Sequence, residues 1–127
     1  MSLSVVQTDN APSPSAPYSQ AIKAGNLLFV SGCVPMDKET LTIKAEGIEA
    51  QTLQALAHLK AVVVAGGSSV DKIVKTTVFI KNMDEFARMN AVYAEFFGGH
   101  KPARSCVEVA RLPLDVLFEI ECIALLG

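Results

Sequence analysis

Apolar residues recur at helical spacing in two stretches of the chain. The first runs from residue 48 to about residue 65 and is closed by Gly66 and Gly67, so it predicts an amphipathic helix. Its expected buried stripe consists of Ile48, Leu53, Leu56, Leu59 and Val63. The second helix is predicted after Asn82 and Glu85, which have the spacing of an N-cap and its capping-box partner. Its stripe consists of Phe86, Met89, Tyr93 and either Phe96 or Phe97.

Shorter runs of apolar and β-branched residues predict strands. They are residues 4–7, the two halves of AIKAGNLLFVSG, residues 72–80, about 103–110 and 117–125. The two halves of AIKAGNLLFVSG meet at Ala24-Gly25-Asn26, which is typical of a hairpin turn. Three prolines between residues 9 and 20 predict an extended, ordered loop, and a short strand pairing is expected at 42–44. The predicted order is β-β-β-α-β-α-β-β.

This order predicts an α+β architecture in which two helices pack on one face of a mixed sheet. The strands, however, carry apolar residues on both faces. Leu27 and Phe29 alternate with Leu28 and Val30, and Ile73 and Phe79 are expected opposite Val74, Val78 and Ile80. An exposed apolar face of this size is unfavourable in a monomer, so we expect other copies of the chain to cover the second face.

Length and composition narrow the class of protein. With 127 residues, the chain is expected to form a single domain over residues 1–127. The net charge of −2 and the dispersed lysines disfavour a nucleic-acid partner. The chain shows no leader pattern and no apolar run that could span a bilayer, so a cytoplasmic protein without a membrane partner is expected.

Cysteine and histidine usage gives no sign of a metal site. The three cysteines lack CxxC spacing, and the two histidines are far apart in the sequence. His58 is expected on a helix surface and His100 in a loop. We therefore predict neither a disulfide framework nor a metal centre.

Arg104 stands at the start of a predicted strand, just after Pro102 and Ala103. If the oligomer partly buries it, the guanidinium needs an anion, and its planar fork suits a carboxylate. The anion is either a ligand or one of Glu108, Glu119 and Glu121. Alternation along the last strand places Glu119 and Glu121 on one face, opposite Phe118, Ile120, Cys122 and Ala124. From this pattern alone, two solvated glutamates on an edge strand are the simpler interpretation.

Several motifs together resemble the RidA family, the YjgF-type reactive-intermediate deaminases. They are APYSQAI at 16–22, LLFVSGCVP at 27–35, EAQTLQAL at 49–56, VKTTVFIKNMDEFARMNAVYAEFF at 74–97, PARSCVEVARLP at 102–113 and EIE at 119–121. The resemblance implies a chorismate-mutase-like fold, a homotrimer with clefts between subunits, and no cofactor. It also implies a hydrolase for C=N bonds that acts as a 2-iminobutanoate/2-iminopropanoate deaminase. Such enzymes convert imines or enamines released by pyridoxal-phosphate enzymes into 2-oxo acids and ammonia.

The same resemblance assigns roles to individual residues. Arg104 is expected to bind the substrate carboxylate, and Glu119 to orient or deprotonate the attacking water. Cys106 is expected to line the pocket through its main chain and not as a nucleophile. The remaining lining positions are Tyr18, Ser31, Gly32 and Asn90. Two positions depart from the family pattern. Ala16 replaces a glycine, and alanine is unfavourable there if the backbone needs positive φ. Cys33 replaces a glutamine and so removes an amide near the cleft, which bears on substrate preference more than on activity.

Two other functions stay open at this point. The first is a non-catalytic trimer that binds small carboxylates in the same clefts. The second is an endoribonuclease or translation inhibitor, an activity also attributed to relatives. The second has less support, because the basic residues are dispersed and aromatic residues make up only 6% of the chain.

Overall fold

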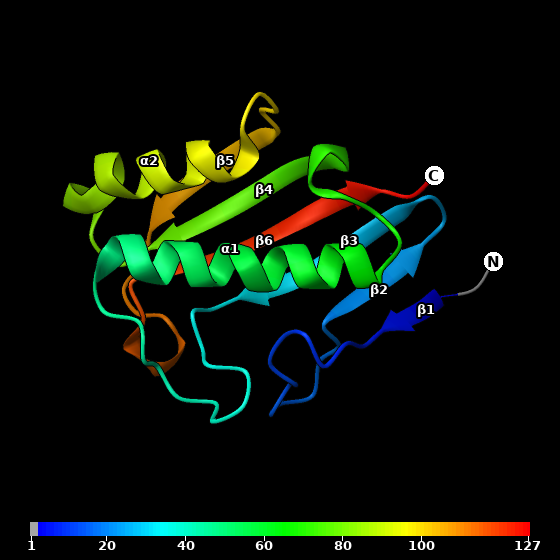
Figure 1. The fold of residues 1–127 in the computed structure, drawn as a ribbon, viewed down its shortest axis with the longest axis horizontal. Helices are drawn as coiled ribbons and strands as arrows, with labels where there is room; N and C mark the ends of the chain where they lie inside the picture. The colour runs from blue at the N-terminus through cyan, green and yellow to red at the C-terminus, as the bar shows by residue number, and fades with distance from the viewer. Residues whose placement is uncertain (1–2) are drawn as a thin grey trace.

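The computed structural model describes residues 3–127 and contains a six-stranded mixed sheet with two helices on one face (Figure 1). The strands are β1 (Leu3–Val6), β2 (Ala21–Ala24), β3 (Leu27–Cys33), β4 (Ile73–Ile80), β5 (Ala103–Glu108) and β6 (Phe118–Leu125). The helices are α1 (Gly47–Ala65) and α2 (Phe86–Phe97), and three single 3-10 turns lie at Val70–Lys72, Met83–Glu85 and Pro113–Asp115. The predicted α+β class and element order are confirmed.

The strands lie side by side in the order β1-β2-β3-β6-β4-β5. Neighbours pair antiparallel except β4 and β5, which are parallel and are joined by the crossover through α2. The predicted hairpin between β2 and β3 turns at Gly25, where a φ of 61° favours glycine. This topology makes β5, which carries Arg104, an edge strand beneath α2.

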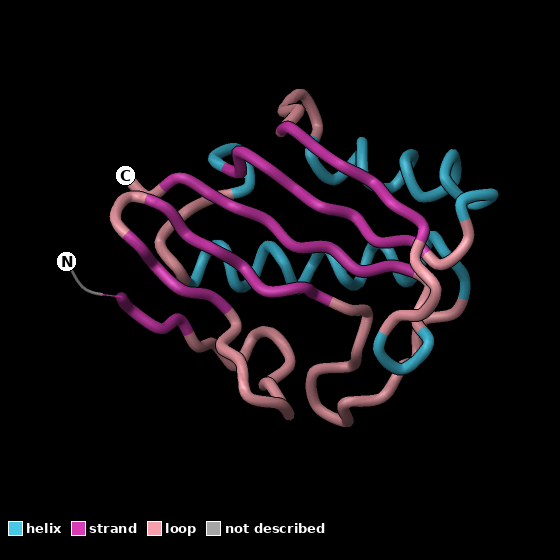
Figure 2. The backbone as a smooth tube through the Cα atoms, turned by 180° about the vertical axis from the view of Figure 1, so that it is seen from behind, coloured by secondary structure: helices cyan, strands magenta, loops and turns pink. Residues whose placement is uncertain are grey.

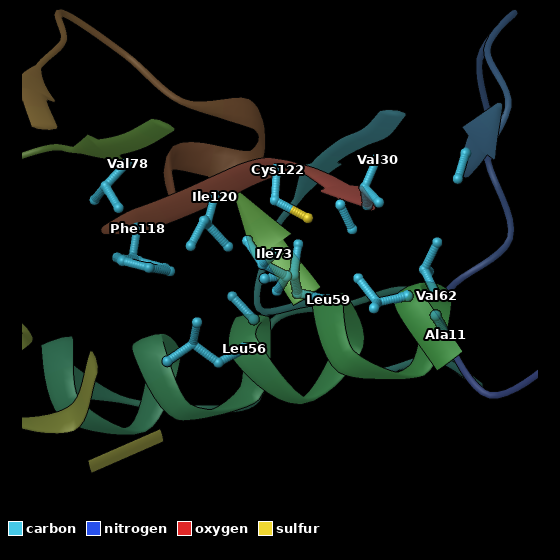
Figure 3. Packing of buried hydrophobic residues seen from close by; sticks show 14 of the residues in the cluster. Ala11, Val30, Leu56, Leu59, Val62, Ile73, Val78, Phe118, Ile120 and Cys122 are labelled. Atoms are coloured by element: carbon cyan, nitrogen blue, oxygen red, sulfur yellow. The ribbon is translucent and has the colours of Figure 1, made fainter. Parts of the chain in front are cut away.

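The hydrophobic core lies between α1 and the sheet. Figure 3 shows Leu56, Leu59 and Val62 of α1 facing side chains of β6 such as Phe118 and Ile120. All five side chains are at most 2% exposed. Close packing of this kind fixes the position of β6, and with it the direction in which the alternate side chains of that strand point.

Two predictions about α1 are wrong. Leu53 is 60% exposed, because the face that packs on the sheet is centred on Ala55, Leu59 and Val62 and Leu53 lies beside it. His58 is only 7% exposed, and its Nε2 lies 2.6 Å from the carbonyl oxygen of Met36. Burial lowers the pKa of His58. Through its contact with Met36, the histidine ties α1 to the loop that follows β3.

Two predictions about strands also need correction. A bulge between Ile73 and Lys75 places Ile73 in the core and leaves Val74 exposed, so the face expected for each of them is reversed. Residues 42–44 form no strand. Instead the backbone N–H of Asp37 donates to the carbonyl oxygen of Thr42 at 2.8 Å, which closes a turn.

Within residues 3–127, no helix covers the second face of the sheet, as Figure 2 shows from behind. Phe29 and Val107 on that face are 42% and 43% exposed. Its cover by other copies of the chain stays a prediction. No helix in the same range has the length and apolar content needed to cross a membrane.

Gln20 organises the N-terminal loop that carries Tyr18. Its Oε1 accepts from the backbone N–H of Thr8 at 2.8 Å, and its Nε2 donates to the carbonyl oxygens of Thr8 at 3.1 Å and Pro12 at 2.9 Å. The side chain is 5% exposed. The predicted ordered loop is therefore held by a single buried amide.

Replacing this amide tests its contribution to stability. We expect Gln20→Leu to lower the free energy of unfolding by about 1–3 kcal/mol, because buried backbone groups lose their partners. Denaturant unfolding at one fixed protein concentration measures the difference. Gln7→Leu is the control, since Gln7 is exposed and its side chain makes no hydrogen bond within residues 3–127. Equal stability of the Gln20 variant and wild type would contradict the role of this residue.

Candidate active site

One group of predicted site residues gathers at a single end of the sheet. In Figures 1 and 2 the loops 7–20 and 34–46 and the turn at 113–115 lie at this end. They enclose an open cleft of about 640 Å³. Four of the residues assigned from the resemblance line it, namely Tyr18, Ser31, Gly32 and Glu119.

A bulge in β3 brings the backbone against Glu119. The pairing of β3 with β6 is interrupted between Val30 and Cys33, which places Ser31 and Gly32 in the bulge. The Ser31 hydroxyl donates to the carbonyl oxygen of Ser19 at 2.6 Å, fixing the bulge to the N-terminal loop. Gly32 has no room for a Cβ, because the carboxyl group of Glu119 occupies that position. The glycine thus permits the carboxyl group to lie directly on the strand.

The surroundings of Glu119 favour its protonated form. Burial, and then the nearby charge of Glu121, raise the pKa of the Glu119 carboxyl above its ordinary value. A carboxylate with a raised pKa is a better proton acceptor than a solvated one. Glu119 is therefore equipped to take a proton from a water molecule in the cleft.

Arg104 belongs to a second group on the helix side of the sheet. Its Nη1 donates to Oδ1 of Asn90 at 2.7 Å. Its guanidinium carbon lies 4.7 Å from the ring centre of Tyr93 and 5.5 Å from that of Phe86. The Tyr93 hydroxyl is bonded to Oγ1 of Thr76 at 2.8 Å. One amide and two aromatic rings therefore hold the guanidinium in place.

No carboxylate in the described chain pairs with Arg104, since none of its ion pairs involves this residue. The internal partners considered from the sequence are therefore wrong. Glu108 instead accepts from the backbone N–H of Met83 at 2.8 Å. Glu119 and Glu121 line the cleft of about 640 Å³ described above, away from Arg104. A partly buried guanidinium without a carboxylate is an anion-binding group by its chemistry.

Arg104 and Glu119 lie on opposite faces of the sheet. Arg104 pairs in register with Thr76 of β4, whose side chain is fully buried on the helix side. Glu119 pairs with Phe79, three residues farther along β4. The two residues are therefore roughly 10 Å apart along the strands and roughly 10 Å apart across them, with the sheet between. One small molecule cannot contact both side chains in a single copy.

The cysteines behave as packing residues. Cys106 alternates with Ser105 and Val107 and so faces the same side as Arg104. Burial raises the pKa of its thiol, which keeps it protonated at neutral pH. Burial likewise raises the pKa of Cys33, whose Sγ lies 3.5 Å from the carbonyl oxygen of Ser31. Ala16 has no positive φ, so alanine fits where the family has glycine.

Phe86 and Tyr93 belong to the group around Arg104, although the sequence alone indicates only that they share the apolar stripe of the second helix. Their spacing from Asn90, four residues before and three after, places all three on one helix face. That spacing is the signal that could have grouped them. Within residues 3–127 no three His, Cys, Asp or Glu side chains are clustered as metal ligands.

Comparison with known proteins gives consistent matches along the chain. A RutC family protein of Pyrococcus horikoshii is 55% identical over 120 residues, which cover 94% of this chain and 95% of the relative. The 2-iminobutanoate/2-iminopropanoate deaminase of Salmonella typhimurium is 49% identical over 122 residues, or 94% of each chain. The crystal structure of Escherichia coli TdcF with bound serine has a TM-score of 0.92 at 43% identity, and the match covers 98% of this chain and 99% of that one.

The family model described as Endoribonuclease L-PSP matches residues 8–126. The motifs that carried the resemblance in the sequence all fall within this range. The chain therefore belongs to the Endoribonuclease L-PSP family, whose members include the RidA or YjgF-type deaminases.

Proposed function

We propose that the protein hydrolyses 2-imino acids and their enamine tautomers to 2-oxo acids and ammonia. The observation that carries this proposal is Arg104, a guanidinium held by Asn90 and Tyr93 without any carboxylate partner in residues 3–127. Its free edge suits a bidentate carboxylate, which every 2-imino acid supplies. Two of the relatives support the proposal: one is named as such a deaminase, and another binds serine, a small amino acid with a carboxylate.

The proposed site needs two copies of the chain. One copy supplies Arg104 with Asn90 and Cys106, and a neighbour supplies Glu119 with its cleft. Two observations support this: the two groups lie on opposite faces of one sheet, and the open face exposes apolar side chains that an oligomer would cover. A homotrimer accounts for both observations. Each of its three equivalent interfaces joins one face of a copy to a different face of the next copy, and the contacts close into a ring.

The proposed reaction is a hydrolysis without a cofactor. Arg104 fixes the carboxylate, so that C2 of the imine faces the water at Glu119. The water oxygen forms a bond to C2 while Glu119 takes its proton, and the C=N electron pair moves to nitrogen. The resulting carbinolamine then loses its C–N bond as ammonia leaves and C2 becomes a carbonyl. Both protons of the water end on nitrogen. Glu119 is one group able to return the proton that it took, and the carbinolamine hydroxyl gives up the other as C2 becomes a carbonyl.

RNA cleavage has less physical support in this chain. The family description and the names of some relatives refer to endoribonucleases. The net charge is nevertheless −2, and the lysines are dispersed along the sequence. A nucleic-acid groove needs clustered cations to displace counterions.

The proposal is tested with the wild-type protein and an imine that is generated in situ. A threonine dehydratase releases 2-iminobutanoate, and the appearance of 2-oxobutanoate is followed with and without the protein. We expect the protein to accelerate this step over spontaneous hydrolysis. An unchanged rate, together with measurable binding of 2-oxobutanoate, would support the non-catalytic carboxylate-binding function instead.

Gly32→Ala tests the contact between the bulge and Glu119. The added Cβ would coincide with the Glu119 carboxyl group, so that group has to move. We expect kcat/KM to fall about 100-fold, the effect of displacing a catalytic group by about 1 Å. Thermal stability should change little, because the far end of a flexible side chain can rotate away.

Gly99→Ala is the matched control for this substitution. A Cβ at Gly99 would meet no atom within 4 Å, and its φ is not in the left-handed region. Full activity is expected in this variant. If Gly32→Ala were equally active, the position of Glu119 against the bulge would be irrelevant to the reaction.

A further inference from the structure

Two leucines beside the Glu119 cleft have a disfavoured backbone conformation. Among residues 3–127, the non-glycine residues with positive φ are Leu41, Leu114 and Asp115, with values of 59°, 56° and 55°. Both leucines line the same cleft as Glu119. A left-handed conformation is costly for a residue with a branched side chain, and it persists only where its surroundings enforce it.

The surroundings of Leu114 enforce its conformation from both sides. Leu112 and Val116, its neighbours at two residues' distance, are buried at 6% and 1% exposure. Asp115 donates its backbone N–H to the carbonyl oxygen of Leu112 at 2.9 Å, and its carboxylate pairs with Lys81 at 2.9 Å. The turn is thus anchored on both sides, and the Leu114 side chain points outward, 59% exposed.

The loop of Leu41 is fixed in a comparable way. The backbone N–H of Leu41 donates to the carbonyl oxygen of Asp37 at 2.8 Å. The Asp37 carboxylate accepts from the backbone N–H of Thr40 at 2.9 Å, and His58 holds Met36. Leu41 is 39% exposed. In two separate loops, therefore, a leucine at the same cleft is held in a backbone conformation that costs free energy.

We propose that Leu41 and Leu114, together with Val34 and Met36 of the same cleft, form an apolar wall that receives the substrate side chain. The wall selects 2-imino acids with a branched aliphatic side chain over those with a methyl group. This inference rests on the proposed function, since it assigns a specificity to the same site. Glu121, also in the cleft, adds a negative charge that disfavours acidic side chains.

The kinetic test compares two imines made by one amino acid oxidase, 2-imino-4-methylpentanoate from leucine and 2-iminopropanoate from alanine. For Leu114→Ala, we expect the ratio of kcat/KM for the larger imine to that for the smaller to fall about 10-fold, the usual effect of removing part of an apolar pocket. Leu41→Ala should lower the ratio in the same direction. Leu53→Ala is the matched control, because Leu53 is 60% exposed on α1 and outside the cleft.

Leu114→Gly separates specificity from folding. Glycine removes both the side chain and the cost of positive φ. We expect this variant to unfold at the same temperature as wild type or higher, yet to lose the preference for the larger imine. The proposed apolar wall would be contradicted if the ratio of kcat/KM for the larger imine to that for the smaller were unchanged in all Leu114 and Leu41 variants, or if it rose.

A binding measurement distinguishes failure of this inference from failure of the proposed function. The stable products 4-methyl-2-oxopentanoate and pyruvate carry the same side chains and are titrated calorimetrically into wild type and Leu114→Ala. Suppose that no imine is hydrolysed but that the larger oxo acid binds wild type about 10-fold better than it binds the variant. This result would contradict the proposed catalysis and support the apolar wall. Equal binding to both proteins would reject the wall even if hydrolysis is observed.

Discussion

Arg104→Ala is expected to lower kcat/KM for 2-iminobutanoate hydrolysis by at least about 100-fold, the effect of losing two charge-assisted hydrogen bonds to the substrate carboxylate. The guanidinium is already oriented by Asn90, Tyr93 and Phe86, so little side-chain entropy is lost when it binds an anion. The same coupled assay measures the loss. Product binding should weaken in parallel, because the 2-oxo acid carries the same carboxylate.

Arg104→Lys shows whether charge alone suffices. Lysine keeps the cation but loses the planar fork and the stacking on Tyr93. We expect this variant to be nearly as inactive as the alanine variant. An active lysine variant would reduce Arg104 to a general source of positive charge, and an active alanine variant would remove it from the mechanism.

Arg88→Ala is the control for this pair of variants. Arg88 lies on the same helix side but is exposed, and its Nε and Nη2 donate to Glu49 at 2.9 Å and 2.8 Å. The Arg88 bridge lowers the pKa of Glu49 to about 2. Losing an exposed bridge between the helices should leave the imine assay unchanged.

The elements could be predicted from the sequence because local patterns determine them. Gly66 and Gly67 end α1 as expected, and the alternation along β6 places Glu119 and Glu121 opposite the core. Details that depend on tertiary packing were missed. The exposure of Leu53 follows from how α1 lies across the sheet, which its own sequence does not specify.

The arrangement of the site was harder to predict than its residues. Alternation states which residues of one strand share a face, but it does not relate the faces of two strands that are distant in the sequence. The register of β5 on β4 places Arg104 on the helix side, and the pairing of β6 places Glu119 on the other. An internal ion pair between them was therefore plausible from the sequence and is absent from residues 3–127 of the structure.

Glu119→Gln is expected to lower kcat by about 10²- to 10⁴-fold, the contribution of a positioned base. The raised pKa of Glu119 also predicts a pH dependence: in wild type kcat/KM falls as pH drops through that pKa and Glu119 becomes protonated. The glutamine variant should lose this acidic limb. Because the charge of Glu121 contributes to the raised pKa, Glu121→Gln should keep the limb but shift it to lower pH.

The same raised pKa has a consequence for stability. The folded protein binds a proton at Glu119 more readily than the unfolded chain does, so between the two pKa values stability falls as pH rises. Glu119→Gln should therefore be more stable than wild type at neutral pH and lose this advantage at acidic pH. Thermal unfolding at both pH values measures the difference. A glutamine variant that is inactive and also less stable at neutral pH would point to misfolding rather than to a missing base.

Mixing the two inactive variants tests whether one site draws on two copies. An interface formed by Arg104 from a Glu119→Gln subunit and Glu119 from an Arg104→Ala subunit has both functional groups intact. In the proposed homotrimer, assembled at random from equal amounts of the two variants, about one quarter of the interfaces have this composition, so co-refolding should restore about that share of wild-type activity. The double variant mixed with Arg104→Ala has no Arg104 at any interface, so it gives no rescue and serves as the control. Recovery of activity from two separately inactive proteins cannot arise if each copy contains a complete site, whereas its absence in confirmed mixed oligomers would place Arg104 and Glu119 in unrelated sites.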